Sequence, residues 1–106
     1  MRLSSTGPIF TILDGETESN IVTVHIIRAR GLCIGAPATA IGTLTVEVSF
    51  DDGETFFTLR SGGADVNLAV GKATPLDFVG WTAMRLSSTL EQTSDQVFPT
   101  GLVEET

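Results

Sequence analysis

The sequence predicts an all-β fold, a small antiparallel β-sandwich or barrel (jelly-roll-like) of about eight short strands. The first observation is the alternation of apolar and polar residues from Thr43 to Phe50, which gives a strand one buried side and one wet side. The second is the Asp52-Gly53 pair that follows, because glycine allows the positive φ of a tight hairpin. The third is composition, since β-branched residues abound and Lys72 is the only lysine. No window of helical length carries an apolar stripe.

The length fits one domain. A chain of 106 residues with 42% hydrophobic content can bury a single core. We expect residues 1–13 to form an N-terminal arm or a first strand, and residues 14–106 to form a single β domain. The apolar stretch at 9–13 is too short for the hydrophobic region of a signal peptide, and no stretch approaches a membrane span.

The remaining strands are predicted from short β-rich runs separated by Gly, Pro, Asp and Ser. Besides the hairpin at 43–60, we expect strands at 8–13, 21–28, 31–34, 66–70, 75–78 and 81–87, and a broken or bulged one between 97 and 103. Pro75 marks either the start of its strand or a strand at a sheet edge, because proline cannot donate to a ladder. Short strands at this spacing are typical of a sandwich or small barrel.

The buried sides follow from the alternation. In the hairpin we expect the inward residues to be Leu44, Val46, Val48 and Phe50. In the strand at 21–28 the inward residues are expected to be Val22, Val24 and Ile26, and the outward ones Ile21, Thr23, His25 and Ile27. Cys33, in an apolar run, is expected to be buried, and no intrachain disulfide is possible with one cysteine.

Some apolar residues are candidates for an interface. The outward side of the strand at 21–28 is not fully polar, which suggests that another chain covers it. The first thirteen residues are polar and then apolar around Pro8, so they could add a strand to a neighbouring chain. The possible interface residues are therefore Ile9, Phe10, Ile12, Ile21 and Ile27.

The net charge of −7 restricts the class of partner. An acidic surface repels phosphate backbones, so we expect no nucleic acid partner and, without a spanning segment, no membrane. The charge provides solubility, or else matches a basic protein surface and speeds docking.

The hairpin turn resembles an Asp-box, the S-x-D-x-G-x-T-W hairpin of sialidase propellers and other β proteins. The matching residues are Ser49, Asp51, Gly53 and Thr55, with Phe56 in the usual Trp position. The expected role is structural, because these side chains can hydrogen-bond the backbone of the turn. A single copy cannot build a propeller.

Candidates for chemistry are few. Asp51, Asp52 and Glu54 crowd one turn, but calcium loops space their ligands more widely. His25 and Cys33 lack zinc partners, and no G-x-S-x-G elbow is present. Trp81 is expected to pack in the core rather than to stack on a sugar. We therefore expect no enzymatic activity, no cofactor and no metal.

From residue 43 to about residue 100, the order of strands and turns resembles small structural proteins of tailed bacteriophages, in particular capsid decoration (cement) proteins. The pattern runs from the hairpin through Ser61-Gly62-Gly63 and Gly71-Lys72-Ala73-Thr74-Pro75 to the strand that starts at Trp81. The resemblance implies attachment to the major capsid protein on the outer capsid surface, as a dimer or trimer made in the host cytoplasm. Two alternatives stay open: a tail, neck or fibre-associated virion module, and a carbohydrate-binding module.

Overall fold

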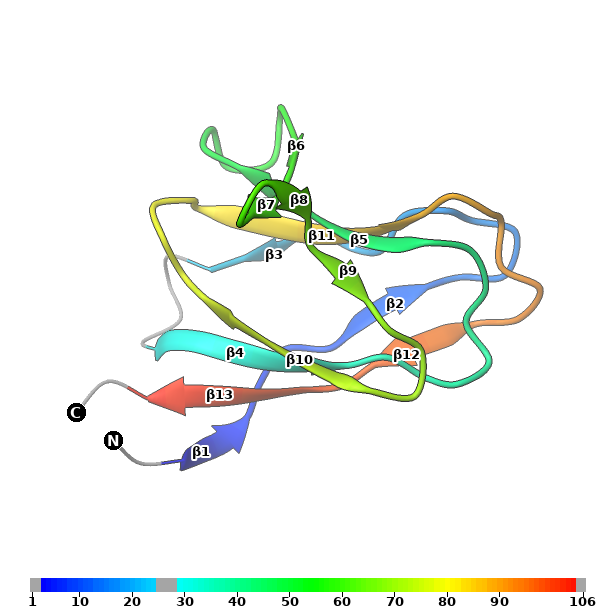
Figure 1. Cartoon of the computed structure of the whole chain (residues 1–106), viewed down its shortest axis with the longest axis horizontal. Helices are drawn as coiled ribbons and strands as arrows, with labels where there is room; N and C mark the ends of the chain where they lie inside the picture. Colours follow the sequence, from blue (N-terminus) through cyan, green and yellow to red (C-terminus); the bar gives the residue numbers. More distant parts are fainter. Residues whose placement is uncertain (1–2, 25–28, 105–106) are drawn as a thin grey trace.

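The computed structural model describes residues 3–24 and 29–104. The described chain forms two antiparallel sheets that face each other (Figure 1), so the all-β prediction and its sandwich alternative are confirmed. The strands are β1 Leu3–Thr6, β2 Phe10–Ile12, β3 Val22–Thr23, β4 Ala29–Gly35, β5 Leu44–Ser49, β6 Phe57–Thr58, β7 Arg60–Ser61, β8 Ala64–Asp65, β9 Asn67–Leu68, β10 Ala73–Asp77, β11 Ala83–Ser88, β12 Gln96–Phe98 and β13 Thr100–Glu104.

The first sheet has the order β1-β13-β4-β10, and the second has the order β3-β11-β5-β6, with β9 also paired to β5. Two further pairs, β2 with β12 and β7 with β8, complete the described strands. The β2–β12 ribbon lies at one end of the sandwich, and the β5–β6 hairpin projects away from the body (Figure 1). Most residues of the connection from β5 to β6 are exposed, while β5 and β6 hold its two ends in the second sheet.

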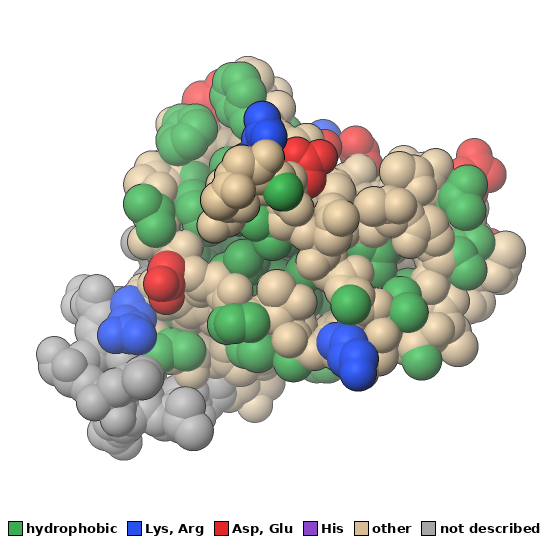
Figure 2. Space-filling view, in the orientation of Figure 1, with side chains coloured by type: hydrophobic (Ala, Val, Ile, Leu, Met, Phe, Trp, Pro, Cys, Tyr) green, Lys and Arg blue, Asp and Glu red, His purple; other side chains and the backbone are tan. Residues whose placement is uncertain are grey.

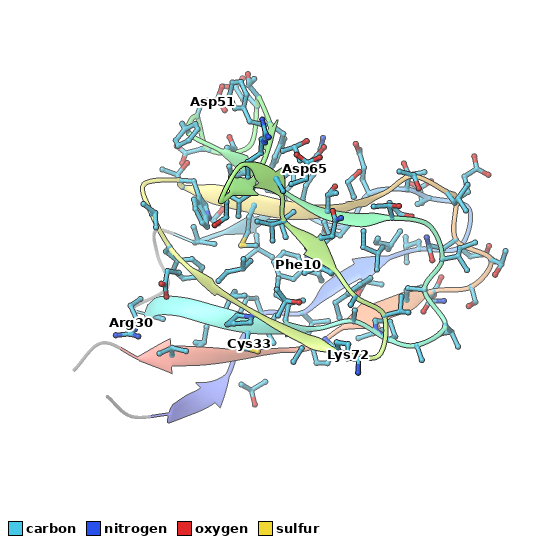
Figure 3. The ribbon with its side chains drawn as sticks, in the orientation of Figure 1. Phe10, Arg30, Cys33, Asp51, Asp65 and Lys72 are labelled. Atoms are coloured by element: carbon cyan, nitrogen blue, oxygen red, sulfur yellow. The ribbon has the colours of Figure 1, made fainter. Side chains whose placement is uncertain are left out.

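The core lies between the sheets and receives side chains from both. β5 and β11 contribute Val46 and Leu86, which face each other across the ladder and are fully buried. β4 contributes Leu32 and Ile34 from the opposite sheet, and Phe10 of β2 lies between the layers (Figure 3). The alternation in β4 and β5 therefore defines the two inner faces.

The expected inward side of β5 is correct for three residues and wrong for the fourth. Leu44, Val46 and Val48 are buried, but 60% of the Phe50 side chain is exposed. The reason is the buried Ser49, where β5 ends and whose hydroxyl accepts hydrogen bonds from the turn. Phe50 follows the end of β5, so the alternation of the strand no longer determines its burial.

The N-terminal segment belongs to the sandwich of its own chain. β1 pairs with β13, and β2 pairs with β12. The side chain of Asn20 joins the segment before β3 to β2. Its Oδ1 accepts from Thr11 N–H at 2.8 Å, and its amide donates to Ile9 O at 3.2 Å. Residues 3–6 and 10–12 are thus strands paired within this chain.

Other local expectations need adjustment. Val24 is buried, whereas Val22 is only partly buried against the core. Cys33 is partly exposed rather than buried, because it points away from the inner face of β4 between Leu32 and Ile34. The expected strand at 66–70 is reduced to β9. His25, Ile26 and Ile27 lie outside the described residues.

Candidate functional site

The Asp-box-like turn is built around Ser49 and Asp51. The Ser49 hydroxyl donates to Asp51 Oδ1 at 2.7 Å and accepts from the backbone N–H groups of Asp51 at 3.3 Å and Gly53 at 2.8 Å. Asp51 Oδ1 also accepts from the N–H groups of Glu54 at 3.2 Å and Thr55 at 2.9 Å. These bonds pair polar groups of the turn with one another, so they hold the turn in its conformation.

The backbone of the turn requires positive φ at two adjacent residues. Asp52 has φ 61° and Gly53 has φ 100°, within a connection longer than a tight hairpin turn, because β5 ends at Ser49 and β6 begins at Phe57. A Cβ at Gly53 would lie 3.3 Å from Ile21 Cγ2. Ile21 therefore packs against the turn, although nearly half of its side chain is exposed.

Hydrogen bonds to the charged form lower the pKa of Asp51. The Ser49 hydroxyl makes the largest contribution, followed by the Thr55 backbone and hydroxyl, and together they lower the pKa from 3.8 to about 2. Because the folded pKa lies below the unfolded one, ionised Asp51 stabilises the fold at neutral pH. This contribution is lost as the pH falls from about 4 towards 2.

We expect Asp51→Asn to unfold at lower urea concentration than the wild type at pH 7, and the difference to shrink between pH 4 and pH 2. The asparagine keeps the shape and an acceptor oxygen but loses the charge. Urea midpoints at pH 7, 4, 3 and 2.5 measure the effect. Glu54→Gln is the control, since it removes one charge from the same turn. An identical profile for both variants would assign the effect to net charge instead of these bonds.

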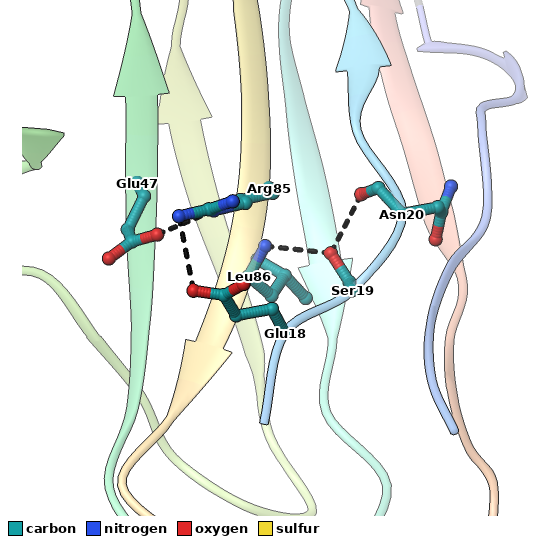
Figure 4. A network of polar contacts seen from close by, with 6 residues as sticks. All are labelled: Glu18, Ser19, Asn20, Glu47, Arg85 and Leu86. Atoms are coloured by element: carbon teal, nitrogen blue, oxygen red, sulfur yellow. Dashed lines mark hydrogen bonds and ion pairs between the residues drawn. The ribbon is translucent and has the colours of Figure 1, made fainter. Parts of the chain in front are cut away.

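Phe56, in the position of the Asp-box Trp, packs on an ion-pair network. The Arg85 guanidinium carbon lies 3.9 Å from the centre of the Phe56 ring. Arg85 Nε contacts Glu47 at 2.7 Å, and its Nη2 contacts Glu18 at 3.1 Å (Figure 4). The network joins β5, β11 and the chain before β3 through one guanidinium and two carboxylates, so it ties these segments together and keeps a net negative charge.

Within residues 3–24 and 29–104, no three His, Cys, Asp or Glu side chains gather as a metal site would require. Trp81 is 7% exposed and belongs to the core, where it makes an edge-to-face contact with Phe78 at 6.2 Å between ring centres. The prediction that it packs in the core is confirmed. Its indole Nε1 is buried without a hydrogen-bond partner among the described residues.

An apolar groove opens between the two sheets, beside the projecting hairpin. We call it the mouth groove; it has a volume of about 650 Å³. Hydrophobic side chains gather on the hairpin and in the recess below it (Figure 2). Its apolar lining comes from β5, from the chain between β5 and β10, from β10 and from the connection between β10 and β11: Val48, Phe50, Leu59, Val66, Pro75, Leu76, Val79 and Trp81.

Exposed apolar side chains extend the mouth groove outwards. Val79 is 71% exposed, and Phe50 contacts the exposed Phe57 with ring centres 6.1 Å apart. These three residues are large, apolar and outside the core. An apolar surface continuous with a groove is typical of a binding site.

The polar part of the lining consists of Arg60, Ser61 and Asp77. Arg60 Nε lies 3.7 Å from Asp65 Oδ1, and its guanidinium donates to Gly63 O, so its charge is matched locally. Asp77 is exposed and has no ion-pair partner among the described residues. The charge that the mouth groove offers to a partner is therefore negative.

The predicted interface residues divide into three groups. Ile9 and Ile21 are about half exposed, on the side of the molecule formed by β2 and the chain before β3. Phe10 and Ile12 are fully buried in the core, so their assignment to an interface is wrong. They pair through β2 with β12, which turns both side chains inward. Ile27 lies outside the described residues.

Sequence reasoning missed the exposed residues around the mouth groove. The sequence carried a signal for Phe57, because Phe56 precedes it directly and adjacent side chains of an extended strand point to opposite sides. For Phe50 the signal was the Asp-box itself, because its serine begins the turn and the strand therefore ends before Phe50. Val79 carried no signal, because its position depends on how β10 leaves the sheet edge.

Comparison with protein family models, curated sequences and solved structures finds no match for this chain. The described part of the chain contains no helix that could span a membrane.

Proposed function

We propose that this chain is a bacteriophage capsid decoration protein, which binds the outer surface of the assembled capsid and stabilises the shell. The observation that carries the proposal is the mouth groove with its exposed Phe50, Phe57 and Val79 on a small sandwich. Apolar surface held out on a sheet-supported hairpin suits binding to another protein. The resemblance in strand and turn order supports the same class of protein.

The distribution of polar groups favours attachment over catalysis. Ser49 and Asp51 bond the turn, and Arg85 bonds two carboxylates. The buried Gln92 amide accepts from Ile41 N–H at 3.0 Å and donates to Ile41 O at 2.9 Å. These polar side chains fix loops and turns, which makes the sandwich a stable spacer for its exposed surface.

The proposed partner is the major capsid protein, and the proposed state is a dimer or trimer on the capsid exterior. Binding to the intact lattice stabilises it by mass action, because the ligand prefers the assembled state. An oligomer that contacts several capsid subunits gains avidity from modest individual contacts. The net charge of −7 would speed docking onto basic capsid patches and make attachment sensitive to salt.

The test mixes the purified protein with expanded capsids that lack it and sediments the particles. We expect saturable co-sedimentation that weakens as salt rises, and a higher temperature of shell disruption for decorated capsids. Protein that stays in the supernatant at every salt concentration would contradict the proposal.

A tail, neck or fibre-associated module and a carbohydrate-binding module are the alternative functions. Labelling of the protein in whole particles distinguishes the first alternative from capsid decoration, because a tail, neck or fibre module would place the label there and not on the capsid. A glycan array separates the second. Exposed Phe50 and Phe57 would provide its stacking surface, since Trp81 is buried.

A further inference from the structure

We propose that the mouth groove docks a linear segment of the partner protein in which one or two large apolar side chains are flanked by lysine or arginine. The inference rests on the proposed function in one respect, that the partner carrying this segment is the major capsid protein. The groove, its rim charge and the neighbouring sheet edge each limit what can bind.

The apolar part of the occupant follows from the lining and the volume. About 650 Å³ lies within the range of pockets that bury ligands, and its walls include Leu59, Leu76 and Trp81. At the outer part of the groove Phe50 and Val79 are exposed, and Phe57 continues the apolar surface from Phe50 along the hairpin. A compact small molecule would leave this extension uncovered, whereas a segment with a second apolar residue would cover it.

The basic flanks follow from the rim. Asp77 lines the groove and has no ion-pair partner among the described residues. The positive charge of Arg60 is balanced by the carboxylate of Asp65. The hairpin turn beside Phe50 adds the exposed residues Asp51 (Figure 3), Asp52 and Glu54, each with a carboxylate. An apolar centre with an acidic rim is complementary to an apolar segment between basic residues.

Side chains rather than a shared β-ladder anchor the segment. On β10 the N–H of Phe78 bonds Arg30 O in β4, so alternation directs the backbone groups of Pro75 and Asp77 to the free edge. Pro75 has no N–H to offer there, which blocks strand addition along this edge. The anchors of a docked segment are therefore apolar side chains that enter the groove.

The experiment compares two lysine substitutions of exposed valines in capsid co-sedimentation. Val79→Lys places a positive charge at the mouth groove, and Val97→Lys places one on β12, away from it. We expect the dissociation constant to rise about tenfold or more for Val79→Lys and to stay within about twofold for Val97→Lys. Phe50→Ala should weaken binding as Val79→Lys does, and Asp77→Asn should lower its salt dependence. Because all four residues are exposed, circular dichroism should show wild-type folding.

The outcomes separate the two proposals. If the wild type sediments with capsids and both valine variants bind equally well, the mouth groove is not the docking site and the decoration proposal stands. If Asp77→Asn binds more tightly, the occupant is not basic and the inference fails. If the wild type does not sediment at all, the decoration proposal fails and the capsid occupant fails with it.

Discussion

Val46→Asp is expected to prevent folding. Val46 is fully buried in β5 and faces the fully buried Leu86 of β11, so a carboxylate there would have neither water nor a partner. Burial of an unpaired charge costs on the order of 4 kcal/mol or more. That approaches the whole stability of a small domain, about 5–15 kcal/mol. Circular dichroism and solubility of the purified variant measure the result.

The matched control is Phe50→Asp, on the same side of the strand by simple alternation. Because Phe50 is mostly exposed, this variant should fold with nearly unchanged stability. Equal damage from both substitutions would place Phe50 inside the core and contradict the described end of β5.

Gly31→Ala is expected to have the second largest effect. A Cβ at Gly31 would collide with the backbone oxygen of Leu76 and lie 3.1 Å from Asp77 Cα. These atoms belong to the backbone of β10, paired directly to β4, so they cannot rotate away as a side chain would. Overpacking of this kind costs about 1–3 kcal/mol, or roughly 5–15 °C in melting temperature.

Gly101→Ala provides the comparison, since Gly101 lies in the same sheet on the opposite side of β4 and has open space around its Cβ position. We expect its melting temperature to stay close to that of the wild type. If Gly31→Ala also melts like the wild type, then β10 does not pack on β4 as closely as described.

Local patterns were sufficient to predict the hairpin. The alternation along β5 and the Asp52-Gly53 pair depend only on neighbouring residues, and the structure has the strand, the turn and the positive φ in place. The Asp-box residues were found for the same reason, because their hydrogen bonds span a few positions. The burial of Phe50 was predicted wrongly because the alternation was extended past Ser49, where β5 ends and the turn begins.

Contacts between distant segments could not be predicted. Phe10 and Ile12 form the same apolar pattern whether they pack on their own core or on a neighbour, and only the pairing of β2 with β12 decides. The mouth groove has the same origin, since Val48 of β5 and Leu76 of β10 line it together only once the two sheets have packed. The order β1-β13-β4-β10 is a property of the whole chain and has no local signature.

The pairing of β1 with β13 has a consequence for biosynthesis. Leu3 faces Val103 in the ladder, so the first strand of the sandwich waits for one of the last to leave the ribosome. Closing so long a loop costs entropy before any contact is gained, and topologies of this kind fold slowly. Until then the nascent chain exposes unpaired edges, and β1 is completed only after nearly all of the sequence has been translated.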